Sequence, residues 1–242
     1  MPLTSALSAL AESITEDRPP KVRDYFRFSS LGHCPVKQLA ERAGLHPLVK
    51  PQRQAVFKMW VGKTLHEEAQ KHLVKSGFIS QESVEKEVRL GSYFGKIDGL
   101  TTNLPGCPLA VLEFKTAADD AITKKDWPEH YKWQGLAYGM AVGAEKVLFV
   151  QLGTNYGLGR ENVVQVSQEW RRKITRHIQL MDKLWGVYEK TKKLPKMHYH
   201  RFGWEDKYCS FIGLGDVPQR QKKAPYRPYL EPKPGEPGLG EE

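Results

Sequence analysis

Two acidic residues and a lysine lie in an otherwise apolar stretch near the middle of the chain. Asp98 follows Gly-Lys-Ile, and Glu113 and Lys115 are part of Val-Leu-Glu-Phe-Lys. If the two segments are strands joined by the short loop between them, the two carboxylates are neighbours. Hard oxygen ligands of this kind suit Mg²⁺ or Mn²⁺, and a divalent ion would remove the repulsion between two half-buried acids.

The lysine would add a second chemical role to this pair. Beside the ion, Lys115 could orient an attacking water molecule and stabilise negative charge that develops on a phosphate. The alternative is an ordinary solvated strand face, because 27% of the residues are charged and a lone Glu-x-Lys is a weak signal. Whether these residues form a metal site or a solvated strand face depends on the helices and strands predicted around them.

Alternating and continuous apolar runs predict five strands. Three follow one another at residues 82–90, 93–100 and 109–115, and two more lie at 145–153 and 161–167. Because side chains alternate along a strand, Glu113 and Lys115 project from one face. Leu112 and Phe114 project from the other face, which predicts a strand that is covered on both sides.

Helical periodicity frames these strands. A short helix is expected at residues 35–45, with Pro35 in its first turn, and a helix at 129–143 places Gln134 and Tyr138 one turn apart. A longer helix from residue 53 to Gly77 has one face made of Met59, Gly62, His66, Ala69 and Leu73. His66 should therefore point toward a core or a cleft wall.

The last predicted helix runs from about Gln168 to Lys193, with Ser167 as its cap. Its apolar stripe consists of Trp170, Ile174, Ile178, Met181, Trp185 and Tyr188. Its first turns carry the basic residues Arg171, Arg172, Lys173 and Arg176. Such a cluster is usually a solvated face, but its sign suits a phosphate track, and we assign it as the candidate nucleic-acid-binding surface.

Composition restricts the class of protein. The chain has 242 residues, 40% of them hydrophobic, which suffices for one well-buried domain. An excess of 37 basic over 28 acidic residues gives a net charge of +9 and favours a polyanionic partner such as nucleic acid. No run of 18 apolar residues predicts a membrane span, and the N-terminal residues lack the pattern of a signal peptide. We expect a cytoplasmic protein, or one in the host cytoplasm if the chain is viral.

Three segments follow from this pattern. Residues 1–28 are predicted to be an N-terminal helical extension, with a helix at 3–16, and residues 29–216 a single α/β domain. Residues 217–242 are rich in proline and glycine and poor in apolar residues, which predicts a flexible tail. The tail could serve as a docking segment for a protein partner.

The spacing of these motifs resembles that of a known superfamily. Asp98, fourteen intervening residues and then Glu-Phe-Lys resemble the D-(x)n-E-x-K signature of PD-(D/E)xK nucleases. "GKTLHEEAQ" is similar to the glycine and histidine helix of the RecB-like branch, and "QGLAY" resembles its Q-x-x-x-Y helix. The match covers roughly residues 29–195. It implies a single restriction-endonuclease-like domain, with a central mixed β-sheet flanked by helices in the core order α-β-β-β-α-β, and additional helices.

The resemblance also implies roles for individual residues. A Mg²⁺ or Mn²⁺ ion would be held by His66, Asp98, Glu113 and the backbone carbonyl of Phe114. Lys115 would be the catalytic lysine, and Gln134 and Tyr138 would position the water, the lysine or the DNA strand. Ile97 replaces the proline of the superfamily's name. Glu67 and Glu68 could join a second metal shell or be solvated helix residues, and we favour the solvated interpretation.

A second likeness concerns the cysteines. "SSLGHCPVKQLAERAG" resembles the opening of the iron-sulfur exonucleases associated with CRISPR loci, in which the cysteine is a cluster ligand. A four-iron cluster needs four thiolates, and this chain has only Cys34, Cys107 and Cys209. We therefore expect no iron-sulfur cluster, with Cys34 and Cys209 as packing residues. Zinc binding by these cysteines with His198 and His200 is the minority interpretation.

The resemblance predicts a metal-dependent deoxyribonuclease in which a metal-activated water attacks the phosphodiester. It favours an exonuclease on single-stranded DNA or DNA ends, in recombination, repair or phage DNA processing. Two alternatives stay open. One is a non-catalytic DNA-binding or adaptor protein on a nuclease fold, and the other is a component that cuts only within a larger complex.

Overall fold

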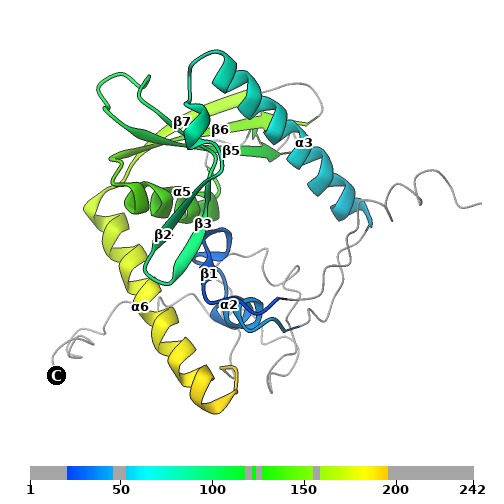
Figure 1. The fold of residues 1–242 in the computed structure, drawn as a ribbon, viewed down its shortest axis with the longest axis vertical. Helices are drawn as coiled ribbons and strands as arrows, with labels where there is room; N and C mark the ends of the chain where they lie inside the picture. Colours follow the sequence, from blue (N-terminus) through cyan, green and yellow to red (C-terminus); the bar gives the residue numbers. More distant parts are fainter. Residues whose placement is uncertain (1–20, 46–52, 118–121, 124–126, 155–158, 196–242) are drawn as a thin grey trace, which may run out of the picture.

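The computed structural model describes residues 21–45, 53–117, 122–123, 127–154 and 159–195 (Figure 1). Its strands form two mixed sheets with helices packed around them. The small sheet has the order β1 (Phe26–Arg27), β3 (Tyr93–Ile97), β2 (Lys86–Leu90). The large sheet has the order β4 (Gly99–Thr101), β5 (Ala110–Ala117), β6 (Lys146–Gly153), β7 (Gly159–Gln165).

Four described α-helices surround the sheets: α2 (Pro35–Arg42), α3 (Arg53–Lys75), α5 (Glu129–Val142) and α6 (Gln168–Thr191). Two 3₁₀ turns, η1 (Phe28–Ser30) and η2 (Gln81–Ser83), complete the elements. The mixed α/β class and the predicted order of helices and strands are confirmed. Within the described ranges, no helix is both long enough and apolar enough to cross a bilayer.

Strand β5 is covered on both faces, as its sequence predicts. Leu112 packs with Leu148 and Ile79 on the side of α3, where the helix contributes Leu73 and Val74. Val111 belongs to the main core on the side of α5, together with Val147 and Phe149 of β6 and Leu136 of α5. Since α5 also contacts β2 and η1, it lies between the two sheets (Figure 1).

The predicted strand 93–100 is two strands in different sheets, divided at Asp98. Strand β3 pairs with β1 and β2, whereas β4 pairs with β5 from Gly99↔Leu112 onward. The reason lies in the side chain of Asp98, whose Oδ2 accepts the backbone N–H of Phe114 at 2.6 Å. If the register of β4 and β5 continued, Ile97 would lie opposite Phe114. The side-chain bond occupies the Phe114 N–H, and the ladder begins only at Gly99.

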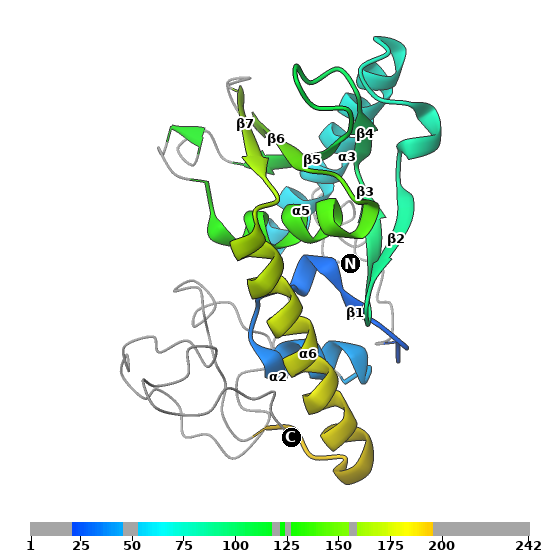
Figure 2. The ribbon, with the colours of Figure 1, turned by 90° about the vertical axis from the view of Figure 1, so that its left-hand side faces the viewer.

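The helix signals are largely confirmed. Pro35 lies in the first turn of α2, and the Ser167 hydroxyl accepts the N–H of Trp170 at 3.3 Å as the cap of α6. Gly143 ends α5 with φ +73°, a left-handed conformation that favours glycine. Helix α6 runs past α5 and down to α2 (Figure 2), and it buries the middle of its predicted stripe, Ile174, Ile178 and Met181. It ends at Thr191, two residues earlier than expected.

Strand β1 was not expected. It pairs in parallel with β3 through Phe26↔Tyr93 and Arg27↔Phe94, and Phe26 and Phe28 are each only 1% exposed. The last residues of the assigned N-terminal extension thus contribute to the core. The predicted helix at 3–16 and the tail at 217–242 lie outside the described residues, and the division of the chain into these segments stays a prediction.

Candidate active site

The predicted acid Asp98 lies where the chain passes from the small sheet to the large one. Its side chain is almost completely buried, and its backbone oxygen accepts a hydrogen bond from Gln70 Nε2 on α3 at 2.9 Å. While Oδ2 accepts the N–H of Phe114, Oδ1 lies 3.2 Å from Nε2 of His66. Both carboxylate oxygens are therefore oriented by neighbouring elements, one by β5 and one by α3.

His66 reaches this point because α3 packs closely on the end of β5. One turn before it, a Cβ at Gly62 would lie 2.7 Å from Oγ1 of Thr116, so the absence of a side chain permits the approach. The His66 ring then lies 5.3 Å from the Phe114 ring. The predicted inward face of α3 is wrong at one position, since Met59 is 70% exposed. Met59 lies two turns before His66, beyond the part of α3 that the sheet covers.

Glu113 is the most deeply buried charge of the cluster. Its side chain has no exposed surface, and Lys115 Nζ lies 2.6 Å from Oε1, with 21% of the lysine side chain exposed. Oε1 is thus satisfied by the ammonium group, whereas Oε2 has no hydrogen-bond partner among the described residues. A buried carboxylate with an unsatisfied oxygen is destabilising unless another ligand completes it.

The environment shifts the pKa values of these groups. Burial raises the pKa of Glu113 to about 7, with Lys115 opposing the shift and Asp98 adding to it. Burial alone would lower the pKa of His66, but the adjacent Asp98 carboxylate outweighs it and the pKa is raised. Burial would likewise lower the pKa of Lys115, yet the charges of Glu113 and Asp98 raise it. Lys115 is therefore a permanent cation at neutral pH.

Helix α5 supplies the two remaining predicted residues. Lys115 Nζ donates to Oε1 of Gln134 at 3.3 Å, which holds the ammonium group between α5 and β5. Tyr138 is buried against Phe28, with ring centroids 4.7 Å apart, and burial raises the pKa of its phenol. A Cβ at Gly95 would lie 2.7 Å from the Tyr138 hydroxyl, so glycine is needed where β3 crosses α5.

Glu85 joins the cluster although it was not predicted. A carboxylate oxygen of Glu85, a ring nitrogen of His66 and a carboxylate oxygen of Asp98 all lie within 4.8 Å of one another. Glu85 has φ +53°, a left-handed conformation that a non-glycine residue rarely adopts and that often marks a functional site. The signal was present in the sequence: a hairpin turning at Gly91-Ser92 pairs Lys86 with Ile97, which places Glu85 opposite Asp98.

The other acids of α3 lie outside the cluster. Glu67 and Glu68 are exposed and form surface ion pairs with Lys63 at 3.6 Å and Lys71 at 2.9 Å. Their geometry is that of solvated helix residues. The described cysteines Cys34 and Cys107 are buried, whereas Cys209, His198 and His200 lie outside the described residues.

The basic cluster of α6 is not part of this site. Helix α6 begins at the end of the large sheet where Lys146 pairs with Gln165, whereas Lys115 pairs with Gln151, five residues away or about 17 Å along the strand. Lys173 pairs with Glu169 at 2.6 Å on the surface. The three arginines of the cluster line an open hollow of ≈ 380 Å³ with Gln168 and Thr175.

The donor set fits a divalent metal ion. The ligand atoms that lie together are those of His66, Glu85 and Asp98. Glu113 is not part of this group, although its carboxylate interacts electrostatically with Asp98 and His66. The unsatisfied Oε2 of Glu113 is a second observation, because a cation would complete it and offset the repulsion with Asp98. Lys115 would add a positive charge beside a bound ion.

No protein-family model and no curated protein sequence matches the chain. Among solved structures it is similar to the protein SSO0001, with 20% identity over 89% of this chain and 96% of that one and a TM-score of 0.53. It is also similar to LHK-Exo, an alkaline exonuclease from Laribacter hongkongensis, with 13% identity, 75% and 97% coverage and a TM-score of 0.51. The LHK-Exo complex with dAMP gives 13% identity, 70% and 93% coverage and a TM-score of 0.52. The chain therefore has a mixed α/β fold of the kind seen in an exonuclease.

Proposed function

We propose that this protein is a divalent-metal-dependent deoxyribonuclease of the PD-(D/E)xK type. The observation that carries the proposal is the fully buried carboxylate of Glu113, paired with Lys115 at one oxygen and unsatisfied at the other, beside Asp98 and His66. A binding-only protein would gain nothing from burying these charges together. The similarity of the fold to LHK-Exo, solved with dAMP, supports the choice of DNA as substrate.

In this proposal His66, Asp98, Glu113 and the Phe114 carbonyl hold Mg²⁺ or Mn²⁺, with Glu85 as a further ligand at the rim. When bound, the ion would lower the pKa of a water molecule and polarise the scissile phosphate. Lys115, held by Gln134 and Glu113, orients that water and stabilises the charge that develops on the phosphate oxygens. Tyr138 stays neutral and supports Gln134 from the next turn of α5.

The proposal extends to the substrate and the setting. We infer an exonuclease on single-stranded DNA or DNA ends, of RecB-like type, without an iron-sulfur cluster and resembling the CRISPR-associated exonucleases. The net charge of +9 supports a polyanionic substrate. Recombination, repair or phage DNA processing in the cytoplasm is the setting we propose, and the proline-rich segment 217–242 is the proposed docking segment for a protein partner.

A cleavage assay tests the proposal. Purified full-length protein is incubated with end-labelled single-stranded and double-stranded DNA in Mg²⁺, Mn²⁺ or EDTA, beside a Glu113→Gln variant. We expect metal-dependent cleavage by the parent, preferentially from ends or of single strands, and no cleavage by the variant or in EDTA. Folded parent protein that cuts no DNA in either metal, or a variant that cuts at the parental rate, would contradict the proposal.

A further inference from the structure

The outer face of the small sheet carries a row of cationic and aromatic side chains. Register places Arg27, Phe94 and Arg89 side by side on β1, β3 and β2. Their neighbours Phe26, Tyr93 and Val88 point inward and are buried, whereas Arg27 and Arg89 are exposed and Phe94 is half-buried. The core is thus complete without the three outward side chains.

The aromatic part of this row is a pair of rings. Tyr25 stands beside Phe94, with centroids 4.7 Å apart, and the Arg89 guanidinium lies 5.0 Å from the Phe94 centroid and 5.8 Å from that of Tyr25. Both rings keep partial exposure. The contact between the exposed Arg89 guanidinium and the two rings stabilises the protein only slightly, because cation–π contacts are weak in water. A ligand could therefore displace Arg89 from the rings.

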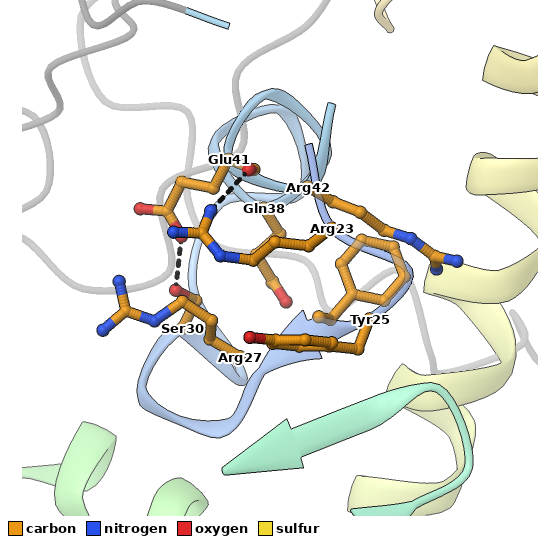
Figure 3. A pocket seen from close by; sticks show the side chains of 8 residues that line it. Arg23, Tyr25, Arg27, Ser30, Gln38, Glu41 and Arg42 are labelled. Atoms are coloured by element: carbon orange, nitrogen blue, oxygen red, sulfur yellow. Dashed lines mark hydrogen bonds between the residues drawn. The ribbon is translucent and has the colours of Figure 1, made fainter. Parts of the chain in front are cut away.

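The charge around the rings is positive. Arg23 and Arg27 flank Tyr25 in the chain, and Figure 3 shows all three beside the Ser30–Glu41 hydrogen bond. Arg23 Nη1 donates to the backbone oxygen of Glu41 at 2.9 Å, which holds the guanidinium group against α2. Four cations, Arg23, Arg27, Arg89 and Lys96, stand against three acids, Asp24, Glu41 and Glu87. The Glu41 carboxylate accepts from Ser30. The other two acids lie 3.8 Å from Arg89 and 3.9 Å from Lys96, in exposed pairs that neutralise little.

The row also leads toward the candidate active site. Phe94 lies four residues before Asp98 on β3, or about 13 Å along the strand. Glu85, at the rim of the site, immediately precedes the first residue of β2. A strand of substrate that crossed the row along β3 would therefore arrive at the cluster of acids.

We propose that this face, which we call the Tyr25–Phe94 face, binds a single-stranded segment of nucleic acid. Bases stack on the two rings while Arg23, Arg27 and Arg89 contact the phosphates, the combination by which single strands are held without sequence preference. Duplex DNA could use the cations but not the rings, because its bases are already stacked. The inference rests on the proposed nuclease function and specifies how its substrate strand is held away from the reacting phosphate.

Binding is measured without cleavage. The full-length Glu113→Gln protein in EDTA is titrated into a fluorescent oligo-dT and into a duplex of equal length, at two salt concentrations. In that background we compare Tyr25→Leu with Phe94→Leu as a double change, and Tyr25→Phe with Phe94→Tyr as the matched control that keeps both rings. We expect the leucine pair to weaken oligo-dT binding by tenfold or more, duplex binding to change by less than threefold, and the control to bind like the background.

A second pair protects the test against misfolding. If the leucine pair fails to unfold cooperatively on heating, Arg27→Gln with Arg89→Gln replaces it, and each lost phosphate contact should reduce the salt slope by about one. Oligo-dT affinity that is unchanged in the folded leucine pair, or in the glutamine pair, overturns the inference and leaves the face to a protein partner. That result would leave metal-dependent cleavage by the parent untouched, whereas a parent that neither binds nor cuts DNA would overturn both proposals.

Discussion

The two concentrations of charge that stand out in the sequence are opposites in the structure. Asp98 and Glu113 are buried, and Oε2 of Glu113 has no hydrogen-bond partner among the described residues. Arg172 and Lys173 project into solvent on α6, where Lys173 simply pairs with Glu169. Exposed charges are compatible with any function, whereas buried and unsatisfied ones oppose folding and call for a ligand. The contrast supports placing the proposed chemistry at Asp98 and Glu113 and not on α6.

The largest effect is expected when the buried acid loses its charge. Glu113→Gln keeps the shape of β5 but removes a hard ligand, so cleavage should fall below detection and metal binding by calorimetry should weaken. The metal-free variant should be at least as stable as the parent, because a crowded buried charge has gone. Glu67→Gln, an exposed acid on α3, is the control and should leave cleavage and metal binding unchanged. A Glu113→Gln variant that cleaves DNA and binds metal like the parent would mean that the buried cluster, like the α6 surface, has no catalytic role.

Removing the lysine should separate chemistry from metal binding. Lys115→Ala should reduce the cleavage rate by roughly a hundredfold or more, as expected for a positioned electrostatic group, with metal affinity near that of the parent. Single-turnover cleavage and calorimetry measure the two quantities. Lys63→Ala, which removes an exposed lysine of α3, serves as the comparison. Equal losses in metal affinity and rate would mean that Lys115 holds the ligand set together and does not act on the substrate.

Glu85 combines features of the two regions: its side chain is exposed like the charges of α6, but its backbone is strained and it lies beside the buried acids. Glu85→Gln should weaken metal binding by about tenfold, the lower end of what a supporting metal contact contributes. Glu85→Gly should weaken it similarly but raise the free energy of unfolding by about 1 kcal/mol, since glycine tolerates φ +53°. Calorimetry and denaturant unfolding check the two values. If glycine neither stabilises the protein nor weakens metal binding, the strained conformation has no role at the site.

A smaller effect concerns pH. The folded pKa of Glu113 is about 7 and its ordinary value is 4.5, so the folded state retains a proton that the unfolded chain has lost. The stabilisation is complete below pH 4.5 and disappears as the pH rises toward and past 7. His33 and His130 have the opposite effect on the pH dependence of stability. Burial lowers their pKa values to about 3 and about 4, so their contribution to stability increases as the pH rises. The difference between parent and Glu113→Gln, measured in EDTA, isolates the carboxyl and should shift in favour of the variant as the pH rises. Excess Mg²⁺ should remove the parent's loss.

The smallest effect is expected on α6. Arg171→Gln with Arg172→Gln should lower DNA affinity by about threefold at low salt and leave the rate at saturating DNA unchanged, because exposed cations add only screened attraction. Binding titrations and saturated cleavage rates check this. A hundredfold loss of rate would mean that the hollow at the start of α6 takes part in catalysis although its charges are exposed.

Local pattern predicted what local physics determines. The cap at Ser167, the stripe of α6 and the two-sided burial of β5 follow from side-chain spacing and are present in the structure. The break of the predicted strand at Asp98 was not predictable in this way, since it depends on a hydrogen bond to Phe114 across sheets. Strand β1 was missed because two residues carry no periodicity. Glu85 could have been found by carrying the hairpin register one pair beyond Lys86 and Ile97.

The position of Asp98 has a mechanical consequence. Its backbone is the joint at which the chain leaves the small sheet, and its carboxylate is fastened to β5 in the large one. An ion bound by both Asp98 and Glu113 would add a second link between this point of the chain and β5. Such a link would reduce the motion of the small sheet relative to the large one. Metal binding at the site would then lower the mobility of β3, the strand that carries Phe94. Affinity for a substrate strand and competence for cleavage would therefore increase together.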